Sequence, residues 1–196
     1  MKQPIEKLMA LTLAALLTGC GEREPATTPA PASSAETPPA PAAAPAAASA
    51  TVQLAPTQGN TANGSLSLAA QGNAVHLTGT IQGLAPNGQF GFHIHEKGDC
   101  SAPDASSAGE HFNPANAQHG NPQGEAHHAG DMLNVTSDAQ GVAQVDAQAD
   151  GATLNGGLAT DVQGRALVLH EKADDYATQP SGASGARIAC GVISGS

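Results

Sequence analysis

Hydrophobic and polar residues alternate along several short segments after residue 50. In residues 73–84, the apolar side chains of Val75, Leu77 and Ile81 fall on one face and polar side chains fall on the other. A period of two is typical of a β-strand with one buried face. Related patterns predict further strands over residues 89–96, 166–170 and 188–194, and weaker patterns predict strands over 65–71, 132–136 and 141–147.

Turn residues separate these segments, and no segment has the length and period of an ordinary helix. Pro86, Asn87 and Gly88 lie between the strands predicted over 73–84 and 89–96, and such a cluster favours a turn. Because this connection is short, we expect the two strands to pair as a hairpin. With three Phe, one Tyr and no Trp in the chain, the core must consist mainly of Val, Leu, Ile and Ala.

The strand predicted over 89–96 carries the first candidate chemistry. Phe90, Phe92 and Ile94 share one face and are expected in the core. His93 and His95 share the opposite face, because successive side chains of a strand point to opposite sides. Two imidazoles at this spacing can bind one metal ion, and imidazole suits copper and zinc alike.

The first residues have the composition of an export signal. Two lysines accompany an apolar stretch over residues 8–17, which is too short to span a bilayer and has the length of the apolar part of a signal peptide. The stretch leads into a Leu-Thr-Gly-Cys run ending at Cys20, which resembles the lipobox of bacterial lipoproteins. That resemblance implies that residues 1–19 are a cleaved signal peptide and that Cys20 is lipidated. The alternative is an ordinary signal peptide followed by an incidental cysteine.

Residues 20–50 differ from the rest of the chain in composition. They contain almost only Ala, Pro, Ser, Thr and Glu after the cysteine, so they cannot bury enough apolar surface to offset the entropy of ordering. We expect an extended, disordered tether. The remaining residues, 51–196, have the size of a single domain.

Charge and cysteine content narrow the class of protein further. The formal net charge is −10, which excludes a basic surface for nucleic acid and would repel an anionic substrate at long range. Cys100 and Cys190 are the two cysteines of the predicted domain. In an exported protein they favour one disulfide, with two free buried thiols as the alternative.

A long segment with little regular pattern, between Glu96 and Asp131, carries most of the other histidines. Loops of this length in a compact domain are usually functional or disordered. His119, His128 and Asp131 are nitrogen and oxygen donors suited to tetrahedral zinc, and one position is lacking. His111 could fill that position with one ring nitrogen and bind a second metal with the other.

Six runs in this part of the chain resemble the copper–zinc superoxide dismutases, and they follow one another in the order of that family. The runs are residues 91–96 (GFHIHE), 109–114 (GEHFNP), 119–120 (HG), 128–131 (HAGD), 170–175 (HEKADD) and 186–193 (ARIACGVI). The resemblance covers essentially the whole chain after residue 51.

The resemblance implies an all-β fold, an eight-stranded Greek-key β-barrel with long metal-binding loops. It implies a copper site of four histidines and a zinc site that shares one of them. The copper ligands would be His93, His95, His111 and His170, and the zinc ligands His111, His119, His128 and Asp131, with His111 as the bridge. Asp174 matches the carboxylate that holds one histidine of each site, here His93 and His119. Cys100 and Cys190 match the family disulfide, and Arg187 matches the arginine beside the copper.

The activity implied is the dismutation of superoxide to dioxygen and hydrogen peroxide, an oxidoreductase reaction with redox-cycling copper and zinc as cofactors. In the family mechanism the bridging His111 leaves reduced copper and carries a proton to the product. Superoxide is then the small-molecule partner, and the membrane is reached only through the lipid anchor. The location expected is the periplasmic side of the envelope, with the outer membrane favoured over the inner because Gly21 follows the cysteine. Bacterial relatives occur as monomers and as homodimers, so either state is compatible.

Some features leave alternatives open. A copper-holding protein without turnover, or a structural envelope lipoprotein, could carry the same fold. Residues 176–186 contain no charged side chain, although many family members have charges there that guide the anion. Lys97 is the candidate for that role, with surface solubility as an equal explanation. His76 and His127 match no ligand position and are interpreted as an exposed strand residue and a loop residue.

Overall fold

The computed structural model describes residues 48–195; the predicted signal peptide, Cys20 and most of the predicted tether lie outside them. Nearly all regular structure in the described residues is β-strand, and one turn of 3₁₀ helix, η1 (Ser106–Ala108), accompanies the strands. The strands are β1 (Ser49–Pro56), β2 (Asn63–Gln71), β3 (Ala74–Gln82), β4 (Gln89–Phe90), β5 (Phe92–His95), β6 (Val135–Thr136), β7 (Ala143–Asp150), β8 (Ala166–His170), β9 (Arg187–Val192) and β10 (Ser194–Gly195). No helix in this described part is long and apolar enough to cross a membrane.

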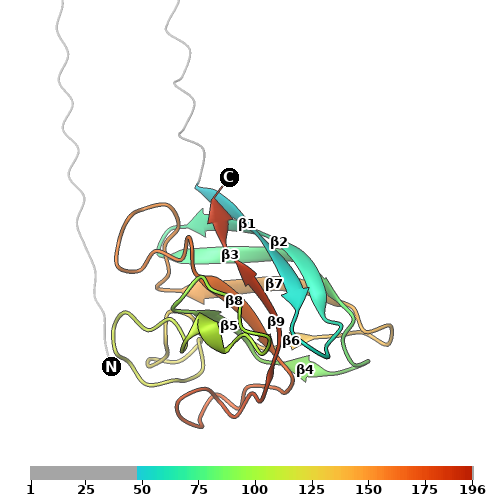
Figure 1. Cartoon of the computed structure of the whole chain (residues 1–196). Coiled ribbons are helices and arrows are strands. Elements are labelled where there is room, and N and C mark those ends of the chain that lie inside the picture. Colours follow the sequence, from blue (N-terminus) through green and yellow to red (C-terminus); the bar gives the residue numbers. More distant parts are fainter. Residues whose placement is uncertain (1–47, 196) are drawn as a thin grey trace, which may run out of the picture. The chain divides into compact units, whose positions relative to one another are not determined.

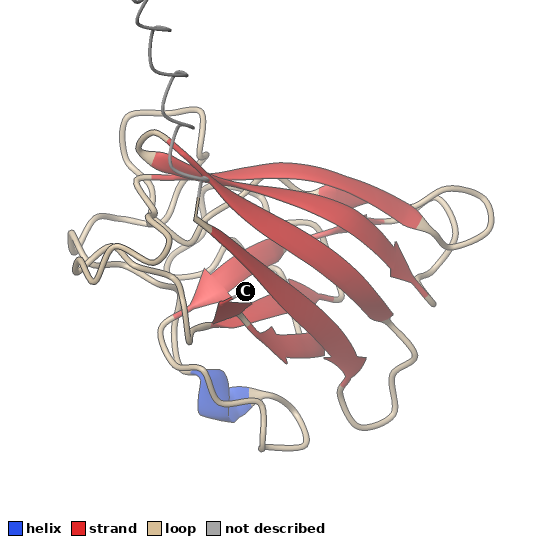
Figure 2. Cartoon of the chain, turned by 90° about the horizontal axis from the view of Figure 1, so that it is seen from above, coloured by secondary structure: helices blue, strands red, loops and turns tan. Residues whose placement is uncertain are grey.

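The strands curl into an antiparallel barrel (Figures 1 and 2). The main sheet has the order β5-β8-β9-β1-β2-β3-β7, with β10 beside β1, and β4 pairs with β6 in a small second sheet. Only Gly91 separates β4 from β5, and a tight turn over residues 137–142 joins β6 to β7. The small sheet therefore continues both ends of the main one, and the predicted eight-stranded Greek-key fold is confirmed.

The predicted hairpin between residues 73–84 and 89–96 is wrong. β3 pairs with β2 along one edge and with β7 along the other, so no edge is left for the next strand in sequence. After the turn the chain crosses the end of the barrel, and β5 pairs with β8 instead. A turn signal indicates where a strand ends, but it does not select the neighbour of the next strand.

β1 is a strand that the hydrophobic pattern did not predict. It begins at Ser49, two residues before the predicted domain boundary, and Ala50, Val52 and Leu54 point into the core. The alternation is present, but it follows directly on an Ala- and Pro-rich stretch and uses small residues. The sequence of β1 by itself predicts a strand only weakly. Hydrogen bonding to β2, β9 and β10 stabilises its extended conformation.

Aliphatic side chains fill the barrel, as the composition predicts. Val75, Leu77 and Ile81 of β3 are fully buried, and the neighbouring strand β7 adds Val145 and small alanines to the same core. Burial of such apolar area is the main stabilising contribution to a fold of this kind. The histidine face of β5 is buried as well, since every residue from Phe92 to His95 is inaccessible.

Two long loops cover that histidine face of β5. The first, residues 96–134, leads from β5 to β6, and the second, residues 171–186, leads from β8 to β9. The disulfide between Cys100 and Cys190 ties the first loop to β9, with the Cα atoms 5.8 Å apart, which confirms the predicted pairing. Because the loops lie against the barrel, the histidines of β5 are enclosed rather than exposed to solvent.

Candidate metal centre

The residues of the predicted metal sites come from two strands and one loop. His93 and His95 lie on β5, and His170 ends β8, the hydrogen-bonded neighbour of β5. The loop over residues 96–134 supplies His111, His119, His128 and Asp131. Strand pairing and the folded loop bring these side chains together from positions up to 77 residues apart in sequence.

Four histidines form the first group: His93, His95, His111 and His170 each offer a nitrogen within 4.8 Å of the others. In three of them the opposite ring nitrogen is already engaged. His95 Nδ1 donates to the carbonyl oxygen of Gly109 at 2.9 Å, His170 Nδ1 donates to that of Gly185 at 3.2 Å, and His93 Nε2 donates to Asp174 at 2.7 Å. These bonds fix the ring orientations and leave one nitrogen of each ring for a metal.

The second group consists of His111, His119, His128 and Asp131, again within 4.8 Å of one another. His111 Nδ1 lies 2.8 Å from one carboxylate oxygen of Asp131. His119 Nδ1 and His128 Nδ1 lie 3.0 and 3.3 Å from carboxylate oxygens of Asp131, but neither has the geometry of a hydrogen bond. Three imidazoles and one carboxylate that converge in this way match the donor set of a tetrahedral zinc site.

His111 belongs to both groups. Its Nδ1 faces Asp131, and its Nε2 is buried without a hydrogen-bond partner among the described residues. Its ring centroid lies 4.0 Å from that of His93. An imidazole in this position can supply one nitrogen to each of two metals.

The fit of metals to these groups can be tested on the unpaired nitrogens. His93 Nδ1, His111 Nε2, His119 Nδ1 and His128 Nδ1 are all buried and lack a hydrogen bond within the described part of the chain. A buried nitrogen left without a partner is costly, and a metal ion at each group would satisfy all four. The all-imidazole group suits copper, and the group with a carboxylate suits zinc.

Asp174 joins the two groups from the second loop. It accepts hydrogen bonds from His93 Nε2 at 2.7 Å and from His119 Nε2 at 3.0 Å, one on each carboxylate oxygen. The backbone N–H of Tyr176 also donates to it, at 2.6 Å. The structure therefore places Asp174 between one histidine of each group, where the resemblance implies it.

Burial and hydrogen bonding shift the pKa values of the metal-free site in opposite directions. Burial lowers the pKa of His111 to about 4 and that of His170 to about 3, so both rings are neutral near pH 7. Burial would also lower the pKa of His119, but its hydrogen bond with Asp174 and its close contact with the Asp131 carboxylate outweigh burial and raise that pKa to about 9. Burial opposes ionisation of Asp131, yet its hydrogen bond with His111 and its contacts with His119 and His128 hold its pKa well below the ordinary range.

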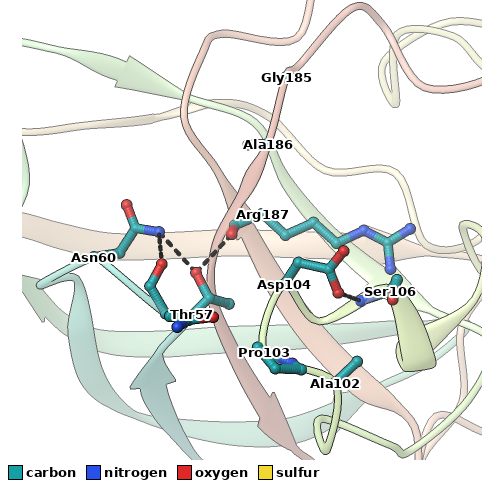
Figure 3. A pocket seen from close by; sticks show the side chains of 10 residues that line it. Thr57, Asn60, Ala102, Pro103, Asp104, Ser106, Gly185, Ala186 and Arg187 are labelled. Carbon is teal, nitrogen blue, oxygen red and sulfur yellow. Dashed lines mark hydrogen bonds between the residues drawn. The ribbon is translucent and has the colours of Figure 1, made fainter.

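Arg187 lies beside the first group, in an open hollow of about 720 Å³ (Figure 3). Its guanidinium donates to the carbonyl oxygen of Ala105 at 2.7 Å and to that of Gly109 at 2.6 Å. Because the same Gly109 oxygen accepts from His95 Nδ1, one backbone group holds both side chains. Gly185, whose carbonyl holds His170, lines the same hollow.

Other candidate residues lie apart from the two groups. Lys97 is exposed and lies 3.6 Å from Glu96, so its charge is partly balanced. His76 is only partly exposed, and its Nε2 lies 2.6 Å from a carboxylate oxygen of Asp146 on β7, a hydrogen bond that its strand pattern did not reveal. His127 belongs to neither metal group.

The comparisons with known proteins agree with this geometry. The family model for copper/zinc superoxide dismutase (SODC) matches residues 62–193. The chain is 38% identical to superoxide dismutase-like protein YojM of Bacillus subtilis, over 96% of this chain and 95% of that protein. It is 40% identical to superoxide dismutase [Cu-Zn] 2 of Aquifex aeolicus, over 74% of this chain and 85% of that one.

A solved structure gives the same result in three dimensions. The crystal structure of the clock protein EA4 superposes with a TM-score of 0.67 at 41% identity, and the match covers 76% of this chain and 94% of that one. The family match, the barrel and the two histidine-rich groups concur, and the chain belongs to the copper/zinc superoxide dismutase family.

Proposed function

We propose that this protein dismutes superoxide: two superoxide anions and two protons become dioxygen and hydrogen peroxide. The observation that carries the proposal is the position of His111, whose two nitrogens face two different donor groups. His93, His95, His111 and His170 would hold copper, and His111, His119, His128 and Asp131 would hold zinc. When bound, copper supplies a reversible one-electron change and zinc a fixed positive charge without redox activity.

His111 is the candidate proton carrier. Its Nε2 is directed at the all-histidine group and is available to hold a proton. Its Nδ1 is kept in place by Asp131 at 2.8 Å, so the ring can release or regain a proton at Nε2 without rotating. Proton delivery from a fixed imidazole next to the reacting anion is general acid catalysis.

Arg187 is the candidate anion-binding residue. Its guanidinium remains charged at any physiological pH. Ala105 and Gly109 accept two of its N–H groups, and the other N–H groups are left to bind an anion. Arg187 and Gly185 both line the hollow (Figure 3). A small anion that enters the hollow meets a positive charge already held in a fixed orientation. This charge offsets part of the free energy that the anion loses when it gives up its hydration water.

We further propose that the protein acts on the periplasmic side of the bacterial envelope, anchored by a lipid on Cys20, with the outer membrane as its destination. The support is the N-terminal sequence: the lysines, the apolar stretch of residues 8–17 and the lipobox-like run before Cys20. Metabolic labelling with a radioactive fatty acid tests this. The expected result is label on the wild type and none on Cys20→Ser.

The oligomeric state is a separate question. Sedimentation of the purified protein distinguishes a monomer from a homodimer.

The activity is tested by superoxide consumption after loading the protein with copper and zinc. We expect rapid copper-dependent turnover that falls by at least about a hundredfold in His111→Ala, since one ring serves both donor groups and the proton. Arg187→Ala should lose roughly tenfold or more, because its charge is the one closest to the reacting anion. Stoichiometric copper binding without turnover in the wild type would overturn the proposal and favour a copper-holding protein.

A further inference from the structure

Gln179 makes a two-point contact with the backbone of His119. Its side-chain Oε1 accepts a hydrogen bond from the His119 N–H at 3.0 Å, and its Nε2 donates to the His119 carbonyl oxygen at 2.8 Å. The same Nε2 lies 3.3 Å from the carbonyl oxygen of Ala177, which orients the amide within its own loop. The contact joins residues 60 positions apart, on the two loops that cover the metal groups.

From this geometry we propose that Gln179 is a positioning residue for the zinc site, acting through His119. The inference rests on the zinc role given to His119 above. His119 is held at three points: its N–H and carbonyl by Gln179, and its ring Nε2 by Asp174. Only Nδ1, which faces Asp131 at 3.0 Å, is left for a metal. A ligand held in this way meets the ion with little further loss of conformational freedom.

The first loop makes the same kind of contact in the opposite direction. Asn134 donates from Nδ2 to the Asp174 carbonyl oxygen at 2.9 Å and accepts from the Asp174 N–H at 2.8 Å. The backbone N–H of Asn134 is in turn held by the hydroxyl of Tyr176 at 2.7 Å. Each loop thus contributes one amide side chain that makes two hydrogen bonds to the backbone of a metal-site residue on the other loop: Gln179 to His119, and Asn134 to Asp174.

The Gln179 contact anchors the part of the second loop that has no charged side chain of its own. Residues 176–186 contain no charged side chain. The Asp175 carboxylate accepts from the N–H groups of Ala177 and Thr178 at the start of this segment, and the Gln179 amide ties the segment to the first loop. An amide that both donates and accepts fixes distance and orientation together. Gln179 is exposed, and removing its amide therefore opens no cavity in the core.

The test compares Gln179→Met with Gln123→Met in the full chain. Methionine keeps the length of the side chain and removes the amide, and Gln123 is an exposed glutamine on the loop that carries His119. Each metal-free protein is loaded with one equivalent of Zn²⁺, and the loss of zinc to a chelator is timed. The visible absorption of the Co²⁺-substituted site is recorded in parallel, because it reports ligand geometry. Unfolding of the metal-free proteins shows whether the variant merely loosens the fold.

We expect zinc loss to be about tenfold faster in Gln179→Met and within about twofold of wild type in Gln123→Met. The Co²⁺ spectrum should change in the first variant alone, with metal-free stability unchanged in both. Equal zinc loss and equal spectra would overturn the inference, as would faster zinc loss that merely follows a loss of metal-free stability. Zinc binding without superoxide turnover would overturn the proposed function and leave this inference intact. A wild type that binds no zinc would overturn both.

Discussion

Asp174 accepts hydrogen bonds from one histidine of each metal group, His93 at 2.7 Å and His119 at 3.0 Å. Both donors are ring N–H groups, so the residue between them must accept on both sides. A carboxylate does so with its two oxygens. An amide of the same shape has one oxygen and one NH₂ group, and the NH₂ group would face a second donor.

Asp174→Asn should therefore weaken zinc retention by about 10- to 100-fold, because one of the two rings loses the partner that fixes its tautomer. Competition with a chelator of known zinc affinity measures the effect. Asp150→Asn, a half-buried carboxylate on β7 that belongs to neither metal group, controls for the change in charge. Equal zinc affinity in the two variants would show that His93 and His119 do not depend on Asp174.

At this scale the side chains of the site could be predicted, and the backbone groups that hold them could not. The sequence has only eight histidines, and their order and spacing, together with that of Asp131 and Asp174, are the basis of the resemblance. The carbonyl oxygens of Gly109 and Gly185 hold His95 and His170, but every residue has a carbonyl. Only the folded path of the loops shows which of them face a histidine.

The loops become part of the site through the disulfide. Cys100 and Cys190 join the first loop to β9 across 90 residues, and between Cys100 and His111 that loop carries the carbonyls of Ala105 and Gly109 that hold Arg187. β9 begins at Arg187 and contains Cys190. The disulfide therefore joins the strand that carries the arginine to the loop that carries its two acceptors.

Replacing both cysteines, as Cys100→Ser with Cys190→Ser, should lower the free energy of unfolding by about 2–5 kcal/mol. A loop of this length gives the unfolded chain much freedom when it is not closed. Urea unfolding of the oxidised wild type and the double variant measures the loss. Turnover per bound copper should fall as well, because Arg187 loses fixed acceptors. Unchanged turnover per copper in the variant would show that other contacts hold the arginine.

The strands differ in how far their own sequences predict them. β3 alternates strongly over nine residues and was predicted almost to its ends. β1 has the same alternation with smaller side chains next to an Ala-rich segment, and tertiary pairing decides its conformation. The partner of β5 depends on long-range order, which local pattern does not contain.

Over the whole molecule, the titrating groups of the metal site should give the metal-free protein a stability maximum near pH 6.5. His111 and His170 have folded pKa values of about 4 and 3, below the ordinary 6.5. The unfolded chain therefore binds more protons across that interval, and stability rises with pH there. For His119, with a folded pKa of about 9, the folded state binds more protons between pH 6.5 and 9, so stability falls as pH rises. Urea unfolding at pH 4, 6.5 and 9 tests this; equal stability at all three would contradict it.

The charge of the whole molecule leads to a prediction about rate. The formal net charge is −10, the second loop has no charge over residues 176–186, and Lys97 lies 3.6 Å from Glu96. Arg187 is the cation beside the metal groups, but it acts only at short range. A negatively charged protein repels superoxide out to about one Debye length, which is about 10 Å at 0.1 M salt and shortens as salt is added, so added salt weakens that repulsion. We therefore expect the second-order rate constant to stay level or rise, by less than about threefold, between 10 and 150 mM salt. Pulse radiolysis at several ionic strengths measures it, with Lys97→Gln as the test of residual steering. A rate that falls steeply with salt, and less steeply in Lys97→Gln, would mean that one lysine focuses the anion despite the net charge.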